Sequence, residues 1–395
     1  MHVLITDDGY KASLGVVRSL GSKGIKVSVL ADSPMALASR SRYCSARYVT
    51  PPLSDPDFLP ALIELLRNVR FDLVMPIGYT STAVMALHKD DILPFTRLEI
   101  PNYDIVRLAA DKHYVHNLAV GMGVPVPRTE FPRSPTEAVL LSAALSWPVV
   151  IKFPHEAPGQ PVYYARTQAE FLDLYQALSA RRNINDDPLP LIQEFVPGFG
   201  AGFFALYQEG ICKRIFMHKR IREIPPSGGM SCCAESFHDP KLKYYGMRLL
   251  DQIGWHGAVM AEFRYDQRDG DFKLIEINPK LWGSLDLALA AGVDFPYDLC
   301  QIARGHTLIY SEQYDRNKRY HWPLTDMQHA FMRPSSLLSV LADLLRPGVD
   351  SNVWWSDLKP NLLEPLSRIR FGAQRLMNVK TSSQAGSRTA PMNTT

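Results

Sequence analysis

A pair of apolar strands joined by a short polar turn constrains this chain more than any other part of its sequence. Residues Ala258–Tyr265 and Phe272–Ile277 each predict a strand. Asp266–Asp271 between them is rich in Asp and Gly, as hairpin turns usually are. Side chains two positions apart on a strand point to the same face, so the hairpin fixes which side chains lie together.

Two carboxylates and an amide fall on this hairpin. Glu262 interrupts the first apolar strand, and Glu276 and Asn278 lie two positions apart at the end of the second, so these two share a face. Hard oxygen ligands of this kind suit Mg²⁺, which usually adds phosphate oxygens and water. The alternative is an ordinary hairpin whose acids face solvent.

Two lysines earlier in the chain bear on this choice. Lys152 interrupts the apolar strand Trp147–Phe153, where a charge either faces solvent or serves a ligand. Lys112 follows Asp111 at the start of a predicted helix, and a helix N-terminus with a lysine can hold an anion. Such a lysine is more often an ordinary solvated helix residue, so its position alone does not decide between the two.

The N-terminal part predicts an open parallel sheet. An apolar run at His2–Thr6 ends in a turn, a helical pattern follows, and a second strand covers Ile25–Leu30. Strand, helix and strand in this order are typical of a Rossmann-like α/β fold. A dinucleotide fingerprint is absent, because the first turn has only Gly9 and then Gly15, so NAD binding is not expected.

The order of these features resembles the ATP-grasp superfamily. Lys112, Lys152, the segment 193–198 (QEFVPG), Glu262 and then Glu276-x-Asn-Pro follow one another as they do in that superfamily. The passages 254–296 and 218–231 are similar to the carboxylate-amine ligase branch related to the large subunit of carbamoyl phosphate synthetase. The resemblance covers residues 1 to about 310. It implies an α/β ATP-grasp fold with an N-terminal Rossmann-like preATP-grasp domain and a C-terminal extension.

The resemblance also implies site residues, with ATP and Mg²⁺ (or Mn²⁺) as cofactors. Five groups of residues receive a role from it. These are Lys112 and Lys152 on the nucleotide phosphates; Glu194, Phe195 and Val196 as a hinge whose backbone holds adenine; Glu262, Glu276 and Asn278 as metal ligands; Arg220 and Lys280 as catalytic cations; and Ser227, Gly228, Gly229 and Ser231 as a loop over the substrate.

Three positions depart from the family pattern. Lys280 follows Asn-Pro where the family usually has Arg, and a lysine lacks the bidentate fork of a guanidinium. The stretch 154–160, where the family often has a glycine-rich loop, contains one glycine. The stretch 198–202, just past the hinge, contains no acidic residue for a ribose.

Four segments are expected along the chain. Residues 1–108 form the preATP-grasp domain, and residues 109–310 form the ATP-grasp domain with a small lobe at about 125–195. Residues 311–380 form the C-terminal extension, in which prolines recur. Residues 381–395 are rich in Ser, Thr and Gly and predict a disordered tail.

The expected activity is an ADP-forming ligase that activates a small-molecule carboxylate as an acyl phosphate and couples it to an amine, with an amino acid as one candidate substrate. One alternative is an ATP-dependent small-molecule kinase, and another is a nucleotide-binding regulatory protein without turnover. A homo-oligomer is possible. His218, His238, His256 and the pair Cys232-Cys233 suit structural roles better than acid-base or thiol chemistry, with His218 the exception worth testing because it neighbours Arg220.

Composition excludes several other classes of protein. A net charge of +3 over 395 residues is far below what nucleic-acid binding requires. Five cysteines without a CxxC pair argue against a zinc site or a disulfide framework and favour a reducing cytosol. The N-terminus does not have the pattern of a signal peptide, and no apolar run approaches the ~20 residues that span a bilayer, so a soluble cytoplasmic protein is expected.

Overall fold

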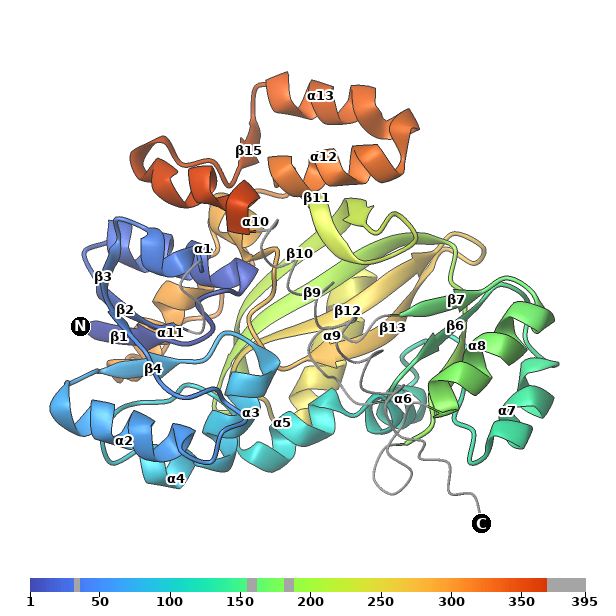
Figure 1. Ribbon diagram of the computed structural model, residues 1–395, viewed down its shortest axis with the longest axis horizontal. Coiled ribbons are helices and arrows are strands. Elements are labelled where there is room, and N and C mark those ends of the chain that lie inside the picture. Colours follow the sequence, from blue (N-terminus) through green and yellow to red (C-terminus); the bar gives the residue numbers. More distant parts are fainter. Residues whose placement is uncertain (32–35, 155–161, 181–187, 368–395) are drawn as a thin grey trace, which may run out of the picture.

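Three sheets organise the protein. The computed structural model describes residues 1–31, 36–154, 162–180 and 188–367, so the expected tail at 381–395 lies outside the described residues. Figure 1 shows a parallel sheet near the N-terminus, a large twisted central sheet, and a small lobe against one end of the central sheet. The mixed α/β expectation is therefore confirmed.

The N-terminal sheet is the strand–helix–strand unit that the sequence predicts. Its four parallel strands have the order β3-β2-β1-β4, and β1 pairs in register with both β2 and β4. Apolar side chains of β1, such as Val3 and Ile5, are fully buried against the helices. The elements are β1 (His2–Ile5), α1 (Lys11–Ser22), β2 (Lys26–Leu30), β3 (Cys44–Tyr48), α2 (Phe58–Asn68), β4 (Leu73–Met75), α3 (Tyr79–Leu87) and α4 (Lys89–Ile92).

The central sheet has seven strands in the order β13-β12-β9-β10-β11-β14-β15, and all pairs except β14–β15 are antiparallel. Helix α9 covers one face and buries Leu242, Leu249 and Leu250. Asp239 caps its first turn, and Gly254 ends it in the left-handed conformation (φ 69°). The elements are β9 (Gly198–Gln208), β10 (Ile211–Ile224), β11 (Met230–Ser236), α9 (Pro240–Ile253), β12 (Gly257–Asp266), β13 (Asp271–Asn278), β14 (Arg319–His321) and β15 (Val349–Ser351).

The small lobe is a four-stranded antiparallel sheet with two helices on one face. Its strands have the order β5-β8-β6-β7, and Phe171 and Tyr175 of α8 are buried against Val149 and Ile151 of β6. Figure 1 shows this lobe beside the β12–β13 end of the central sheet. The elements are β5 (Thr129–Glu130), α7 (Pro135–Ser142), β6 (Val149–Lys152), β7 (Tyr163–Ala165), α8 (Gln168–Ala180) and β8 (Leu191–Glu194).

Two consecutive helices connect the N-terminal sheet to the small lobe. α5 (Tyr103–Ala110) ends at Asp111, which at once caps α6 (Lys112–Gly121) by accepting hydrogen bonds from His113 N and Tyr114 N. Both helices pack on β13. The cap therefore sets Lys112 at the start of α6 beside the hairpin.

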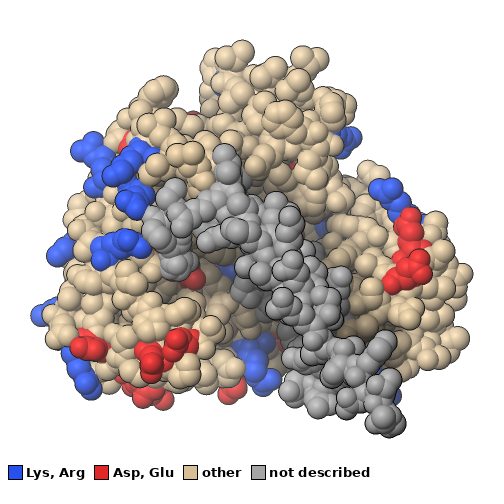
Figure 2. All heavy atoms as spheres, viewed as in Figure 1, with Lys and Arg blue, Asp and Glu red and all other residues tan. Residues whose placement is uncertain are grey.

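The C-terminal part returns to the central sheet. β14 pairs with β11, and β15 pairs with β14, so this segment extends the sheet instead of folding separately. The remaining labelled helices are α10 (Leu285–Ala290), α11 (Phe295–Ala303), α12 (Pro323–Met332) and α13 (Leu337–Leu345), and a further helical stretch covers residues 358–367. Figure 2 shows few Lys, Arg, Asp or Glu side chains over α12 and α13 in this view.

Candidate active site

The hairpin brings the three expected metal ligands together. Glu262 on β12 lies directly opposite Glu276 on β13 in the strand register. Asn278 donates a hydrogen bond from Nδ2 to Oε1 of Glu276 at 3.1 Å. Lys112 reaches Oε2 of the same carboxylate from α6, with Nζ at 3.4 Å.

Arg220 holds the second carboxylate of the pair. Its Nη2 lies 2.7 Å from Oε2 of Glu262, and its Nη1 lies 3.1 Å from Oε1 of Glu223. The guanidinium crosses β9 at Gly200, where a Cβ would come within 2.8 Å of the Arg220 Cδ. A glycine at this position therefore leaves the space in which the arginine lies against the sheet.

Lys152 completes the cluster from the small lobe. Its side chain is buried, and burial lowers the pKa of its ammonium to about 8, against the opposing influence of Glu276. Burial by itself would raise the pKa of Glu276, but Lys112 and Lys152 outweigh it and hold that pKa well below its ordinary value. Glu276 is thus ionised in a half-buried place because cations surround it.

The donor set fits a divalent cation that is shared with phosphate. Within residues 1–31, 36–154, 162–180 and 188–367, no group of three or more His, Cys, Asp or Glu side chains forms a metal cage. Two carboxylates and an amide are the partial set that Mg²⁺ takes when phosphate oxygens and water fill its remaining positions. The surrounding lysines and arginine suit the phosphates themselves.

The expected hinge lies between the small lobe and the central sheet. The side chain of Glu194 accepts a hydrogen bond from Arg128 N at 3.1 Å and contacts Arg268 Nη2. The carbonyl of Val196 accepts one from Arg264 Nε at 3.0 Å, and the ring of Phe195 packs with the Arg264 guanidinium 6.0 Å from its centroid. Arg264 and Arg268, both from the hairpin, therefore hold the hinge against it.

Arg264 is the site residue that sequence reasoning missed. It lies two positions after Glu262 on β12, which puts both side chains on the same face. It also donates from Nη2 to the Gly198 carbonyl at 2.8 Å and approaches Glu223 at 3.9 Å. The two-residue spacing from Glu262 was the signal that could have indicated Arg264. Its contacts with Val196 and Gly198 join residues 68 and 66 positions apart, which no local pattern predicts.

The expected substrate loop is the turn between β10 and β11, with one correction. Ser227, Gly228 and Gly229 lie in that turn, but Ser231 belongs to strand β11, which begins at Met230. The strand continues to Ser236 and pairs with β10. It therefore begins inside the segment that the glycines predicted as a loop.

This turn contacts both sides of the site. The Gly229 carbonyl accepts a hydrogen bond from Arg220 at 3.0 Å. Gly228 (φ 134°) approaches Tyr164 of β7 so closely that a Cβ would lie 2.7 Å from the phenol oxygen. The turn therefore spans from the central sheet to the small lobe.

A β-bulge separates two neighbouring arginines. On a regular strand, Arg220 and Arg222 would share a face, but the pairing of β10 with β11 shifts register between them. Arg220 contacts the hairpin, whereas Arg222 makes ion pairs at 2.6 Å with both Asp326 of α12 and Asp343 of α13. Because of the bulge, Arg220 faces the site and Arg222 faces the extension.

The remaining candidates divide into nearby and structural groups. Lys280 helps to lower the pKa of Glu276, so it belongs to the cluster. His218 is buried, and its Nε2 shares a hydrogen bond of 2.7 Å with Ser284 Oγ. Burial lowers the pKa of its imidazole to about 3. Burial raises the pKa of both Cys232 and Cys233, so neither thiol is activated.

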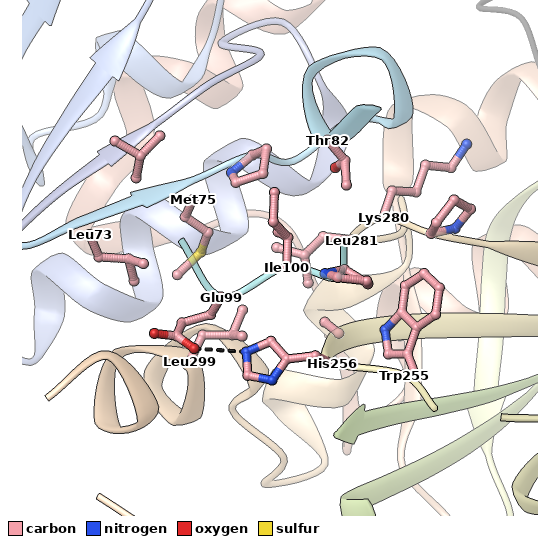
Figure 3. Close-up of a pocket in the computed structure, with 15 residues that line it drawn as sticks. Leu73, Met75, Thr82, Glu99, Ile100, Trp255, His256, Lys280, Leu281 and Leu299 are labelled. Atoms are coloured by element: carbon pink, nitrogen blue, oxygen red, sulfur yellow. Dashed lines mark hydrogen bonds and ion pairs between the residues drawn. The ribbon is translucent and has the colours of Figure 1, made fainter. Parts of the chain in front are cut away.

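A small pocket lies where the N-terminal sheet meets the central sheet. Figure 3 shows apolar side chains around it, an ion pair of 2.8 Å between Glu99 and His256, and Lys280 at its edge pointing away from that pair. Its cavity of about 20 Å³ has room for only one or two water molecules. We therefore interpret the pocket as a packing gap between the two sheets. The ion pair with Glu99 gives His256 the structural role expected for it.

A family model matches the second half of the candidate site. Residues 229–310 match the "Carbamoyl-phosphate synthase L chain, ATP binding domain", a stretch that includes the whole hairpin. The large chain of carbamoyl phosphate synthase from Pyrococcus furiosus is 21% identical over 305 residues. That match covers 74% of this chain but only 28% of the relative, so the chain spans little more than a quarter of that protein's length.

Solved structures show the same arrangement over most of the chain. A biotin carboxylase–ATP analogue complex from Campylobacter jejuni superposes with a TM-score of 0.66 at 18% identity, covering 80% of this chain and 74% of that one. An L-amino acid ligase from Bacillus licheniformis superposes with a TM-score of 0.59 at 14% identity, covering 76% and 73%. The chain has the ATP-grasp fold.

In sequence, the chain is similar to the large chain of carbamoyl phosphate synthase and to its ATP-binding domain. The expected fold and the expected resemblance are both confirmed. Within the described residues, no helix is both long and apolar enough to cross a membrane.

Proposed function

We propose that this chain is an ADP-forming carboxylate-amine ligase that uses Mg-ATP. The observation that carries the proposal is the cluster on the β12–β13 hairpin, where Glu262 and Glu276 face each other and Lys112, Lys152 and Arg220 surround them. Sequence similarity to carbamoyl phosphate synthase and the ATP-grasp fold support it.

Each group of the cluster has a part in the proposed reaction. Glu262, Glu276 and Asn278 would hold Mg²⁺, which supplies charge neutralisation to the ATP phosphates when it is bound. Lys112 and Lys152 would bind the phosphate oxygens, and both already lie close to Glu276. The hinge Glu194–Val196 would receive the adenine between the two lobes.

The acid would be activated next to Arg220. Transfer of the γ-phosphoryl group to a substrate carboxylate gives an acyl phosphate, and attack by an amine then forms the C–N bond and releases phosphate. Arg220 and Lys280 would stabilise the charge on the transferred group, because both lie in the cluster around the carboxylates. The turn 227–229 reaches the small lobe and would help to exclude water from this mixed anhydride.

The substrates belong to the class of small carboxylates and amines. The Bacillus licheniformis relative is described as an L-amino acid ligase, which supports amino acids as candidates for either role. The proposed division of the chain is a preATP-grasp domain at residues 1–108 and an ATP-grasp domain at 109–310, whose small lobe at about 125–195 would close over the intermediate.

The test combines nucleotide binding with substrate-dependent ADP release. Wild-type protein and Glu276→Gln are titrated with Mg-ATP, and ADP release is then measured with panels of acids and amines. Asp269→Asn is the matched control, because Asp269 is an exposed acid in the turn of the same hairpin, where it contacts Lys273 and accepts a hydrogen bond from Asp271 N. We expect the wild type and the control to bind Mg-ATP and Glu276→Gln to lose binding.

The same experiment separates the alternatives. ADP release that requires both an acid and an amine supports the ligase. Release with an acid or alcohol alone would instead make the protein a kinase, and Mg-ATP binding without turnover across the panels would favour a regulatory protein. Equal binding by Glu276→Gln and the wild type would remove the metal assignment.

A further inference from the structure

Helix α13 has its polar and apolar sides reversed relative to a usual surface helix. It buries only Val340 and Asp343, and Asp343 accepts a hydrogen bond of 2.6 Å from Arg222 beneath it. A helix on the surface of a globular protein normally buries its leucines and exposes its charges. Here five leucines stay exposed, between 41% and 84%: Leu337, Leu338, Leu341, Leu344 and Leu345.

These leucines form one continuous surface. At 100° per residue, they fall within an arc of about 120° on the side of α13 away from Asp343. Phe331 and Met332 extend it from the end of α12, with exposed fractions of 81% and 58%. We call these seven residues the leucine face. A contiguous exposed apolar area of this kind marks a place of interaction.

The exposed charged side chains of α12, α13 and the turn between them have one sign. Between residues 323 and 348, the only acids are Asp326 and Asp343, and both are buried in ion pairs with Arg222. Arg333 at the end of α12 and Arg346 at the end of α13 are both exposed.

We propose that the leucine face is a peripheral docking surface for an anionic lipid bilayer. Its leucines would enter the boundary between headgroups and acyl chains, while Arg333 and Arg346 contact lipid phosphates. With nine residues, α13 is about 13 Å long and suits a helix that lies in the plane of the interface. A second copy fits less well, because pairing two such faces would bring their arginines together without an exposed acid on either hairpin.

Vesicle binding by the full chain tests this directly. The protein is sedimented with vesicles of phosphatidylcholine alone and of phosphatidylcholine mixed with phosphatidylglycerol. We expect the mixed vesicles to bind it, and Leu338→Glu/Leu345→Glu to weaken that binding by about tenfold or more. Leu140→Glu is the matched control, because Leu140 is 72% exposed on α7 of the small lobe, away from the extension.

A second pair of variants checks the charge. Arg333→Gln/Arg346→Gln should reduce the preference for mixed over neutral vesicles and make the remaining binding less sensitive to salt. If the glutamate variant does not fold, as judged by its circular dichroism and Tm, Leu338→Ser/Leu345→Ser replaces it. Undiminished vesicle binding by the leucine variants would overturn the proposal, as would no binding by the wild type. A dimer in sedimentation velocity that the leucine variants dissociate, without vesicle binding, would assign the face to a second copy.

Discussion

Two clusters of charge meet β10 at neighbouring positions, Arg220 and Arg222, on either side of its bulge, and they differ in charge balance. In the candidate active site, the cations Lys112, Lys152, Arg220, Arg264 and Lys280 exceed the carboxylates Glu223, Glu262 and Glu276. Under the extension, Arg222 and Arg319 match Asp326 and Asp343. A partly buried cluster with surplus positive charge is suited to an anionic ligand, whereas a balanced, buried one is suited to holding two parts of a fold together.

The largest expected effect comes from a substitution that disrupts only the candidate active site. Glu276→Gln removes a carboxylate that Lys112 contacts at 3.4 Å and that the metal would use. We expect Mg-ATP affinity to fall by about a hundredfold or more, since several kcal/mol of charge neutralisation is lost. Isothermal titration with Mg-ATP measures this. Asp269→Asn should bind like the wild type, and an unchanged affinity in Glu276→Gln would remove the distinction between the clusters.

Breaking the balanced cluster should affect stability instead of nucleotide binding. Arg222→Met leaves Asp326 and Asp343 buried without their main cation, which typically costs about 3–5 kcal/mol. Arg220→Met is the counterpart on the other side of the bulge and should lose ADP release with a smaller change in unfolding free energy. Urea denaturation and ADP release are both measured for each of the two variants. Similar losses of stability in both variants would contradict the assignment.

The surplus charge predicts a pH dependence of nucleotide binding. Because burial lowers the pKa of Lys152 to about 8, its ammonium is present below that pH and is lost as the pH rises through it. The Kd for Mg-ATP should therefore rise between pH 8 and pH 9.5, up to about tenfold per unit. Lys152→Arg keeps its charge and should flatten this rise. A flat profile in the wild type would mean that Lys152 does not hold the phosphates.

A smaller effect concerns His218, the uncharged neighbour of Arg220. Its folded pKa of about 3 lies below the value of 6.5 in the unfolded chain, so the unfolded state takes up a proton first as the pH falls. Stability should decrease from pH 6.5 downward, by about 2 kcal/mol at pH 5. His218→Gln should lose this part of the acid sensitivity in urea denaturation. An equal decrease in the variant would place the sensitivity elsewhere.

The candidate site could be predicted from sequence wherever its residues are close along the chain. Glu262, Glu276 and Asn278 lie on one hairpin, and Lys112 follows its own helix cap, so local patterns placed them correctly. The fold followed from the order of strands and helices together with the resemblance. The two-residue period of β12 also pointed to Arg264, but no role was assigned to it.

Long-range pairing set the limit of prediction. The bulge at residues 220–222 depends on how β10 pairs with β11, and no local signal in the sequence marks it. The reversed burial of α13 depends on Arg222, which lies 121 residues before Asp343. A run of leucines predicts a helix, but it cannot say which side is buried when a distant arginine holds the aspartate inside.

The pairing of β14 and β15 with the central sheet has a consequence for the limits of the folded unit. Without them, β11 would be a bare edge strand, with backbone donors and acceptors open to pairing with other chains. A chain cut before Arg319 would therefore keep every proposed ligand of Mg-ATP and still tend to aggregate. The last strands protect the sheet that carries the site, although they contribute no residue to it.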